Sequence, residues 1–262
     1  MELNLENKLA LVTGSTAGIG YATAEALLHE GARVVISGRT QSAVDEALTK
    51  LGAFGRQVMG YAGDLASANA AEGLARQYPD VEILVNNLGI FEPKPFQEIA
   101  DEDWLRLFEV NVLSGVRLAR AYIPGMRRRD WGRIIFISSE SALQIPAETV
   151  HYGMTKAAQV AVARGLAESL AGTRITVNSI LPGPTRTRGV DSFVDSMTQS
   201  GKKSFADVEQ EFFRNVRPTS LLKRFLTPAE VASMVVYVAS PRASGVTGAA
   251  LRVDGGVVKS AF

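Results

Sequence analysis

The sequence predicts a doubly wound α/β fold, in which a seven-stranded parallel sheet carries helices on both faces. Two observations predict this class. Short apolar segments alternate with longer amphipathic segments along the chain of 262 residues, as they do in consecutive β-α-β units. The first apolar segment, LALV, leads directly into the glycine-rich turn TGSTAGIG and then into a helical pattern. We expect a single domain over residues 1–262, because no repeat, low-complexity stretch or linker-like composition divides the chain.

Seven short apolar segments are the expected strands, and they span residues 8–13, 33–37, 57–61, 83–86, 133–138, 173–181 and 250–254. Six amphipathic segments are the expected helices, and they begin near residues 19, 41, 67, 103, 149 and 228. Right-handed crossovers between parallel strands would distribute these helices over both faces of the sheet.

One long insertion, at about residues 189–226, separates the sixth expected strand from the last helix. Its segment SFADVEQEFFRNV is amphipathic, which predicts a helical lid over the substrate site. The apolar side chains of this insertion would either line the substrate pocket or form core, and they are Phe193, Met197, Phe205, Phe212 and Phe213.

Composition points to a small molecule as the partner. A hydrophobic share of 46% and a charged share of 21% are usual for a globular α/β enzyme. A net charge of +1 provides no field that would attract nucleic acid or a membrane surface. The absence of cysteine excludes disulfides and thiolate metal sites, and with 2 histidines we expect no metal centre. No apolar stretch reaches the roughly 18 residues of a membrane span, so we expect a cytoplasmic protein.

The glycine-rich turn is the first functional motif, and it contains Gly14, Gly18 and Gly20. A turn this tight needs residues without a Cβ, and the helix that follows it presents free N–H groups and a positive dipole end. Between a strand and a helix, such a turn predicts a binding site for the pyrophosphate of a dinucleotide. The alternative is a tight turn that binds no ligand.

Tyr152 and Lys156 form the second motif. They lie four residues apart in HYGMTKAAQV and therefore share one face of the expected helix, while Ser139 follows the preceding strand. An ammonium group beside a phenol favours the phenolate, so Lys156 would lower the pKa of Tyr152. A phenol tuned in this way can exchange a proton with an alcohol or a carbonyl group near neutral pH. Taken singly, a serine cap and an exposed Tyr–Lys pair are the plain alternatives.

Together these motifs resemble those of the short-chain dehydrogenase/reductase family in its compact form, and the chain looks similar to 3-oxoacyl-(acyl-carrier-protein) reductases. The glycine-rich turn fits the family spacing T-G-x-x-x-G-x-G, and residues 86–89 correspond to its N-N-A-G segment with leucine in place of alanine. Further matches run in the family's order through nearly the whole chain, and they are Asn111, Ser139, the pair Tyr152 and Lys156, residues 182–187 and residues 253–256.

The resemblance implies a Rossmann-type NAD(P)(H)-dependent oxidoreductase that interconverts a ketone and a secondary alcohol. Tyr152 would be the general acid or base, and Lys156 would hold the nicotinamide ribose. Ser139 would position the substrate oxygen, and Asn111 would anchor a water that leads from Lys156 to solvent. The cofactor contacts that the resemblance implies are Gly14, Ser15, Thr16, Gly18, Ile19, Gly20, Arg39, Asp64, Leu65, Asn86, Gly89, Tyr152, Lys156, Pro182, Gly183, Thr185 and Thr187.

The end of the second expected strand, VVISGRT, bears on the choice between NADP(H) and NAD(H). An acidic side chain there binds the ribose 2′-hydroxyl, whereas a basic side chain accepts a 2′-phosphate. NAD-preferring members of the family tend to carry Asp at the place of Gly38, and Arg39 follows it, which favours NADP(H). Against this, Ala17 lacks the basic side chain that some NADP-dependent members carry in the glycine-rich turn. Asp64, implied as an adenine contact, has turn formation as its plain alternative.

The expected substrate pocket is largely apolar, which suggests a partly apolar substrate. Leu88 would either fill space near the nicotinamide or pack against the sheet, and His151 has a packing or capping role in preference to a catalytic one. The residues expected at the mouth of the pocket are Phe91, Pro93, Phe96, Glu140, Leu143, Gln144 and Ile145.

Several alternatives stay open at this point. The activity would be that of a 3-oxoacyl-thioester reductase or of a dehydrogenase of a small cyclic or steroid-like alcohol, and a non-catalytic nucleotide-sensing regulator is the alternative class. Ala157, Ala161 and Gly165 form a flat stripe beyond Lys156 that permits close approach of this helix, either to the sheet or to a second subunit. The resemblance implies homodimers or homotetramers, and we expect a homotetramer.

Overall fold

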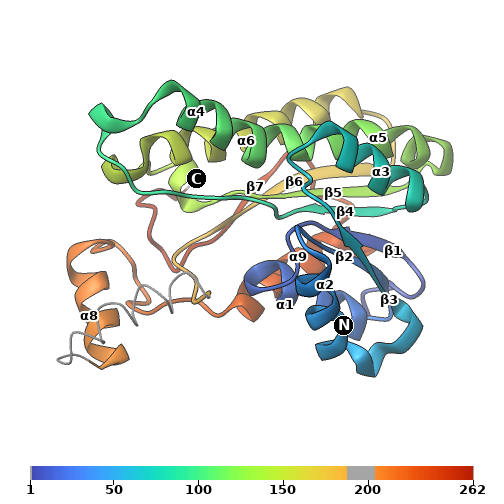
Figure 1. Ribbon diagram of the computed structural model, residues 1–262, viewed down its shortest axis with the longest axis horizontal. Helices are drawn as coiled ribbons and strands as arrows, with labels where there is room; N and C mark the ends of the chain where they lie inside the picture. Colours follow the sequence, from blue (N-terminus) through green and yellow to red (C-terminus); the bar gives the residue numbers. More distant parts are fainter. Residues whose placement is uncertain (1, 188–203, 262) are drawn as a thin grey trace.

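The computed structural model describes residues 2–187 and 204–261. Within these residues, seven strands form one parallel sheet in the order β3-β2-β1-β4-β5-β6-β7 (Figure 1). The strands are β1 (Leu9–Val12), β2 (Arg33–Gly38), β3 (Val58–Ala62), β4 (Ile83–Asn86), β5 (Gly132–Ile137), β6 (Ile175–Pro182) and β7 (Ala250–Val253). The predicted fold class, strand number and parallel direction are therefore confirmed.

Helices cover both faces of this sheet. In Figure 1, α3, α4, α5 and α6 lie above the sheet, and α1, α2 and α9 lie below it. The helices are α1 (Gly18–His29), α2 (Gln41–Lys50), α3 (Ala68–Gln77), α4 (Asp101–Phe108), α5 (Ser114–Arg129), α6 (Val150–Ser169), α8 (Phe205–Asn215) and α9 (Pro228–Ala239). None of the helices in the described part of the chain is long and apolar enough to cross a membrane.

The six expected helix starts agree with the structure to within two residues. The largest difference is at α4, which was expected near Asp103 and begins at Asp101. Three acidic residues, 101–103, fill the first turn of α4, where the helix dipole favours negative charge. The Asp103 carboxylate also accepts a hydrogen bond from the main-chain N–H of Ala100 at 3.3 Å, which fixes the earlier start.

Alternation along the strands explains the two helical layers. In β1, Ala10 and Val12 pack into the core that includes side chains of α1, α2 and α9. Leu9 and Leu11 point the other way, into the core that includes side chains of α3, α5 and α6. Both faces of the strand are buried, which is why it appears in the sequence as an uninterrupted apolar segment.

The strand order reverses between β1 and β4. Strand β1 pairs with β2 on one side and with β4 on the other, so the chains that leave β1 and β4 diverge from neighbouring positions. Open α/β sheets bind ligands outside the carboxyl ends of their strands at such a point. The fold therefore brings together the glycine-rich turn, which follows β1, and residues 86–89 at the end of β4.

Helices α4 and α5 belong to one helical run. A single π-helical turn, η3 (Glu109–Leu113), joins them, and the sequence pattern predicted no such turn. The run ends in three arginines, of which Arg127 donates to the main-chain oxygen of Ser169 and Arg129 to that of Val81.

Only part of the expected lid can be described. Residues 188–203, and with them Phe193 and Met197, lie outside the described residues. Helix α8 lies apart from both helical layers, at the lower left of Figure 1.

The phenylalanines of α8 form a small aromatic cluster. The rings of Phe205, Phe212 and Phe213 lie 6.3, 4.9 and 5.1 Å, centroid to centroid, from the ring of Phe225. Of the two alternatives for these side chains, packing with one another is the one observed. A lid function for the segment stays a prediction.

Candidate active site

The glycine-rich turn has the geometry of an anion-binding helix N-terminus. Gly18, the first residue of α1, has a φ of +57°, a left-handed conformation that favours glycine. A Cβ on Gly20 would lie 2.5 Å from the Asn87 amide nitrogen and 2.6 Å from the main-chain oxygen of Gly14, so only glycine fits there. The N-cap residue, Ala17, has no side chain that could accept from the first N–H groups of the helix. These N–H groups can therefore receive a pyrophosphate.

Asn87 and Thr13 hold this turn against the end of β4. The Asn87 side-chain amide donates to the main-chain oxygens of Thr13 and Gly14 at 2.9 and 3.0 Å. In return, the Thr13 hydroxyl accepts from the main-chain N–H groups of Asn87 and Leu88, both at 2.9 Å. Neither residue was among the predicted contacts, although both belong to the two motifs that the sequence singled out.

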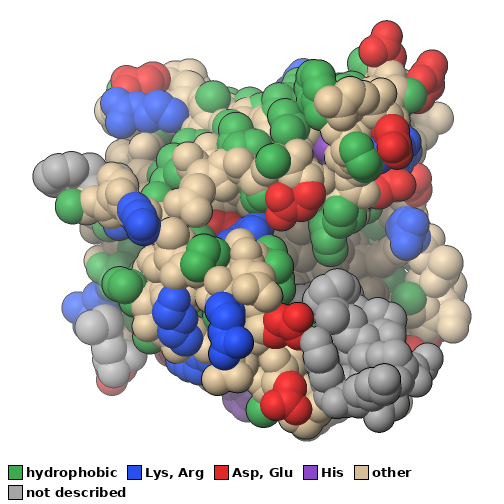
Figure 2. Space-filling view, turned by 90° about the vertical axis from the view of Figure 1, so that its left-hand side faces the viewer, with side chains coloured by type: hydrophobic (Ala, Val, Ile, Leu, Met, Phe, Trp, Pro, Cys, Tyr) green, Lys and Arg blue, Asp and Glu red, His purple; other side chains and the backbone are tan. Residues whose placement is uncertain are grey.

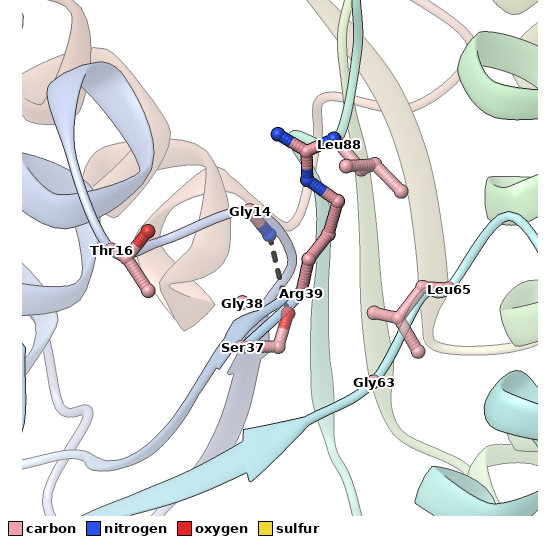
Figure 3. Close-up of a pocket in the computed structure, with 8 residues that line it drawn as sticks. All are labelled: Gly14, Thr16, Ser37, Gly38, Arg39, Gly63, Leu65 and Leu88. Atoms are coloured by element: carbon pink, nitrogen blue, oxygen red, sulfur yellow. Dashed lines mark hydrogen bonds between the residues drawn. The ribbon is translucent and has the colours of Figure 1, made fainter. Parts of the chain in front are cut away.

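A pocket opens beside the turn, at the carboxyl end of β2. Figure 3 shows the Arg39 side chain extending from the end of β2 across this pocket, and a hydrogen bond of 3.2 Å from the Gly14 N–H to the Ser37 hydroxyl. Arg39 is exposed, and no ion pair of its guanidinium occurs among the described residues. The residues that line the pocket are Gly14, Thr16, Ser37, Gly38, Arg39, Gly63, Leu65 and Leu88.

The same pocket explains why position 38 carries no side chain. A Cβ there would lie 2.6 Å from the Thr16 methyl group and 3.2 Å from a Val44 methyl group. An aspartate at this place would therefore displace Thr16. Leu88 lines the pocket and also packs against the core beneath α5, which agrees with the packing alternative stated for it; its place near the nicotinamide stays a prediction.

Other predicted cofactor contacts lie around the turn. A Cβ on Gly18 would lie 3.3 Å from the Thr187 methyl group, so the segment after β6 reaches the start of α1. Asp64 is exposed and accepts a hydrogen bond from the N–H of Ala66 at 3.1 Å, which is its turn-forming alternative. The Asn86 amide is buried beneath Gly115 and has no hydrogen-bond partner in the part of the chain that the structure describes. Its predicted contact with the cofactor stays a prediction.

The four predicted catalytic residues come from three elements that meet beyond this turn. Ser139 follows β5, Asn111 lies in the π-turn η3, and Tyr152 and Lys156 lie on α6. The Lys156 ammonium lies 5.5 Å from the centre of the Tyr152 ring. A Cβ on Gly89 would lie 3.4 Å from that ammonium and 3.5 Å from the Asn111 amide oxygen.

Lys156 is buried and is held by neutral oxygen atoms. Its ammonium donates to the main-chain oxygen of Ile137 at 2.9 Å and to the Gln159 side-chain oxygen at 3.2 Å. Only 4% of the Lys156 surface is exposed, and no carboxylate forms an ion pair with it among the described residues. Burial therefore lowers the pKa of Lys156 to about 7.

Gln159 connects Lys156 to Asn111. The Gln159 amide nitrogen donates to the main-chain oxygen of Asn111 at 2.5 Å, while its oxygen accepts from Lys156. The Asn111 side chain is held separately, since it exchanges two hydrogen bonds with the main chain of Ile90 and donates to the Thr155 hydroxyl. Gln159 was not predicted, although its position three residues after Lys156 places it on the same helix face.

The pKa of Tyr152 is raised, chiefly by burial and then by the negative charge of Glu140, while Ser139 and Arg217 act in the opposite direction. We expected Lys156 to lower this pKa, and that expectation is wrong for this arrangement. Since burial reduces the positive charge that Lys156 carries near neutral pH, its ammonium cannot offset the burial of the phenol. Tyr152 is therefore a protonated phenol at neutral pH, able to donate a proton.

The predicted pocket mouth is partly assembled around Tyr152. The Phe91 ring lies 6.0 Å from the Tyr152 ring, and a methyl group of Ile145 lies 2.6 Å from the place where Gly153 would carry a Cβ. Phe96 instead packs with Trp104 of α4. Figure 2 views the molecule from the left-hand side of Figure 1 and shows hydrophobic side chains gathered in the upper half of that view.

His151 has the packing role that we favoured. Its side chain is completely buried, and its ring lies 5.9 Å from the Trp104 ring. Within residues 2–187 and 204–261, neither ring nitrogen has a hydrogen-bond partner, and burial lowers the pKa of His151, which favours the neutral ring.

The buried ammonium predicts a pH-dependent stability. Between the pKa of about 7 in the folded chain and the ordinary value of 10.5, the unfolded chain binds more protons at Lys156 than the folded chain. The contribution of Lys156 to stability therefore increases as the pH rises through this window and is lost as the pH falls. Between pH 7 and pH 9.5, the free energy of unfolding should increase in the wild type, relative to Lys156→Met, by on the order of 2 kcal/mol.

Urea denaturation at the two pH values measures this difference. Lys50→Met, which replaces an exposed lysine, is the control and should follow the wild type. Parallel pH dependences of the wild type and Lys156→Met would contradict the assigned burial of the charge.

Comparison with known proteins agrees with this geometry. The sequence profile of a family described as Enoyl-(Acyl carrier protein) reductase matches residues 14–258. An uncharacterized oxidoreductase of Bacillus subtilis, YvaG, is 44% identical over 264 residues, which cover 100% of each chain. The 3-oxoacyl-(acyl-carrier-protein) reductase FabG of Vibrio cholerae is 32% identical, over 97% of this chain and 99% of its own.

The chain is also similar to a solved structure. The L-sorbose reductase of Gluconobacter frateurii, complexed with NADPH and L-sorbose, superposes with a TM-score of 0.93 at 34% identity, over 99% of this chain and 100% of the other. The expected family, fold and enzyme class are thereby confirmed. With a glycine-rich turn at the switch point of its sheet and Ser139, Tyr152 and Lys156 beside it, this chain belongs to the short-chain dehydrogenase/reductase family of oxidoreductases.

Proposed function

We propose that this oxidoreductase uses NADP(H) to interconvert a ketone and a secondary alcohol, with Tyr152 as the general acid or base. The observation that carries the proposal is that Lys156 lies beside both Gly89 and the Tyr152 ring, while Tyr152 in turn lies within hydrogen-bond reach of Ser139, next to the end of β4 against which the glycine-rich turn is held. A nicotinamide cofactor, when bound, supplies or accepts the hydride.

Proton transfer, orientation of the substrate and binding of the cofactor ribose are assigned to three residues of this chain. In reduction, the Tyr152 phenol donates its proton to the substrate oxygen, and its raised pKa keeps that proton in place until the carbonyl arrives. Ser139 orients the substrate oxygen toward Tyr152. Lys156 binds the nicotinamide ribose hydroxyls, and Gln159 and the Ile137 carbonyl hold its ammonium in position.

Three features support NADP(H) over NAD(H). Arg39 is exposed at the pocket beside the turn, where a 2′-phosphate would gain a charge-assisted hydrogen bond. Position 38 has no room for the aspartate that would bind the ribose 2′-hydroxyl. The similar L-sorbose reductase was solved with NADPH.

A second candidate function has a narrower class of substrates than ketones and secondary alcohols in general. FabG of Vibrio cholerae acts as a 3-oxoacyl-(acyl-carrier-protein) reductase, and a 3-oxoacyl-thioester activity is the second candidate for this chain. A nucleotide-sensing regulator without turnover is disfavoured because Ser139, Tyr152 and Lys156 are all present.

We also propose a homotetramer, with a homodimer as the smaller alternative. Ala161 and Gly165 of α6 are exposed, and a Cβ on Gly165 would meet nothing within 4 Å. The stripe that these residues form with Ala157 is therefore open to the helix of a second copy.

Removing the phenol oxygen tests the catalytic role. Tyr152→Phe should reduce turnover by at least about 1,000-fold, because the proton donor is lost, while the Kd for NADPH changes less than about threefold. The assay follows NADPH oxidation with L-sorbose, cyclohexanone and ethyl acetoacetate as a ketone panel. Turnover by Tyr152→Phe at the wild-type rate would exclude the role.

Removing the guanidinium tests the cofactor preference. Arg39→Ala should raise the Kd for NADPH by about 10- to 100-fold, since a charge-assisted hydrogen bond to phosphate is lost, and should leave the Kd for NADH unchanged. Nicotinamide fluorescence titration measures both constants. Arg56→Ala removes an exposed arginine outside the pocket and serves as the control. An equal weakening of NADPH and NADH by Arg39→Ala would refute the 2′-phosphate contact.

Sedimentation velocity tests the assembly. At micromolar concentration the wild type should sediment as a tetramer, and Gly165→Glu, which places a charge on the exposed stripe, should shift it toward smaller species. A wild type that sediments only as a monomer would rule the assembly out.

A further inference from the structure

A buried carboxylate lies directly beside the catalytic serine. Glu140 is 5% exposed, and one oxygen of its carboxylate accepts from the Ser139 hydroxyl at 2.5 Å. The same oxygen accepts from the main-chain N–H and the hydroxyl of Ser141 at 2.9 and 3.2 Å. Sequence reasoning placed Glu140 only at the mouth of the pocket, whereas the structure gives it contact with a catalytic residue.

The contact limits what Ser139 can do. A hydroxyl group has one proton to donate, and here Ser139 donates it to Glu140. The Ser139 oxygen already accepts from the N–H of Ser141 at 3.1 Å. A substrate carbonyl must therefore compete with Glu140 for the Ser139 proton, or receive its hydrogen bond from Tyr152 alone.

Arg217 forms an ion pair with Glu140, the group that competes with the substrate for the Ser139 proton. Its guanidinium lies 3.1 Å from the second Glu140 oxygen, with side-chain exposures of 16% and 6%. Arg217 belongs to the chain that follows α8, 77 residues from its partner. The Nη1 atom of the Arg217 guanidinium lies 3.5 Å from a carboxylate oxygen of Glu148. The Glu148 side chain is 53% exposed, so solvent largely screens this second ion pair.

We propose that Glu140 and Arg217 act as a positioning pair, in which Glu140 orients the Ser139 hydroxyl and adds negative charge beside Tyr152, and Arg217 offsets that charge from the segment after α8. The inference rests on the proposed function, since it assigns the pair a part in the proton transfer by Tyr152.

The charges around the phenol support this assignment. Glu140 raises the pKa of Tyr152 and Arg217 lowers it, in addition to the larger effect of burial. Among the described residues, the Lys156 ammonium lies 5.5 Å from the centre of the Tyr152 ring, and the exposed Glu148 lies 3.5 Å from Arg217. A pair that were only a structural link would not move the titration of Tyr152 in opposite directions when each member is neutralised in turn.

Two variants that each remove one charge, Glu140→Gln and Arg217→Met, test this. Alcohol oxidation needs the Tyr152 phenolate, so its rate increases with pH through the apparent pKa of the phenol. The apparent pKa should fall by about one pH unit in Glu140→Gln and rise by about one unit in Arg217→Met. The assay uses NADP⁺ and sorbitol, cyclohexanol or ethyl 3-hydroxybutyrate, whichever the wild type oxidises fastest. The double variant Glu140→Gln/Arg217→Met should return close to the wild-type profile, and Arg217→Lys should retain it.

Arg224→Met is the matched control, because Arg224 follows α8 as Arg217 does but pairs with Glu230 at 2.7 Å. Its pH profile should equal that of the wild type. Shifts in the same direction for Glu140→Gln and Arg217→Met, or lower rates without any shift, would overturn the proposal.

A second measurement needs no turnover and separates this inference from the proposed function. In protein labelled with ¹³C at the tyrosine Cζ, Tyr152→Phe identifies the Tyr152 signal. That signal should begin to titrate at lower pH in Glu140→Gln than in the wild type; an unchanged titration refutes the pair. Absence of turnover with every alcohol, together with the expected NMR shift, would count against the proposed function and leave the pair standing.

Discussion

The parallel direction of the sheet is the constraint on which the functional geometry depends. All seven strands among the described residues run the same way, so the chain leaves β1, β2, β4, β5 and β6 at one edge. The glycine-rich turn, Arg39, Gly89, Ser139 and the segment after Pro182 each follow one of these strand ends. Helix α6 then adds Tyr152 and Lys156 to the same edge, and the Ser138 hydroxyl holds it there by donating to the main-chain oxygen of Lys156 at 2.8 Å.

At that edge of the sheet, two buried ionisable groups, Lys156 and Glu140, have different surroundings. The Lys156 ammonium is surrounded by neutral oxygen atoms of Ile137 and Gln159, which orient it without the full compensation that a carboxylate would give. Glu140 is equally buried, but it has both a cation and three hydrogen-bond donations. The chain thus places a carboxylate paired with Arg217 and a buried lysine without an acidic partner among the described residues close to one phenol.

The sequence was sufficient for everything that local pattern encodes. Strand number, the positions of the helices to within two residues, the turn at Gly18 and the pairing of Tyr152 with Lys156 all follow from periodicity or short spacing. It was insufficient where two distant segments meet. The contact of Arg217 with Glu140 spans 77 residues, and the bridge from Gln159 to Asn111 requires a π-turn that no periodicity indicated. The direction of the Tyr152 pKa shift was wrong for the same reason, because burial depends on the packed structure and spacing does not report it.

The π-turn at residues 109–113 has a further consequence for how this chain can vary. It widens one turn of an otherwise regular helical run, so the faces of α4 and α5 are offset from those of a continuous α-helix. Each residue of an α-helix advances the face by about 100°. Because the wider turn accommodates one extra residue, loss of a single residue near Asn111 would restore a regular helix and leave Leu107 and Leu118 facing their cores, but it would remove the turn whose Asn111 main-chain oxygen accepts from Gln159. The extra residue is therefore not needed for the packing of α4 and α5, and its consequence lies in the active site, where it places the Asn111 main-chain oxygen against Gln159.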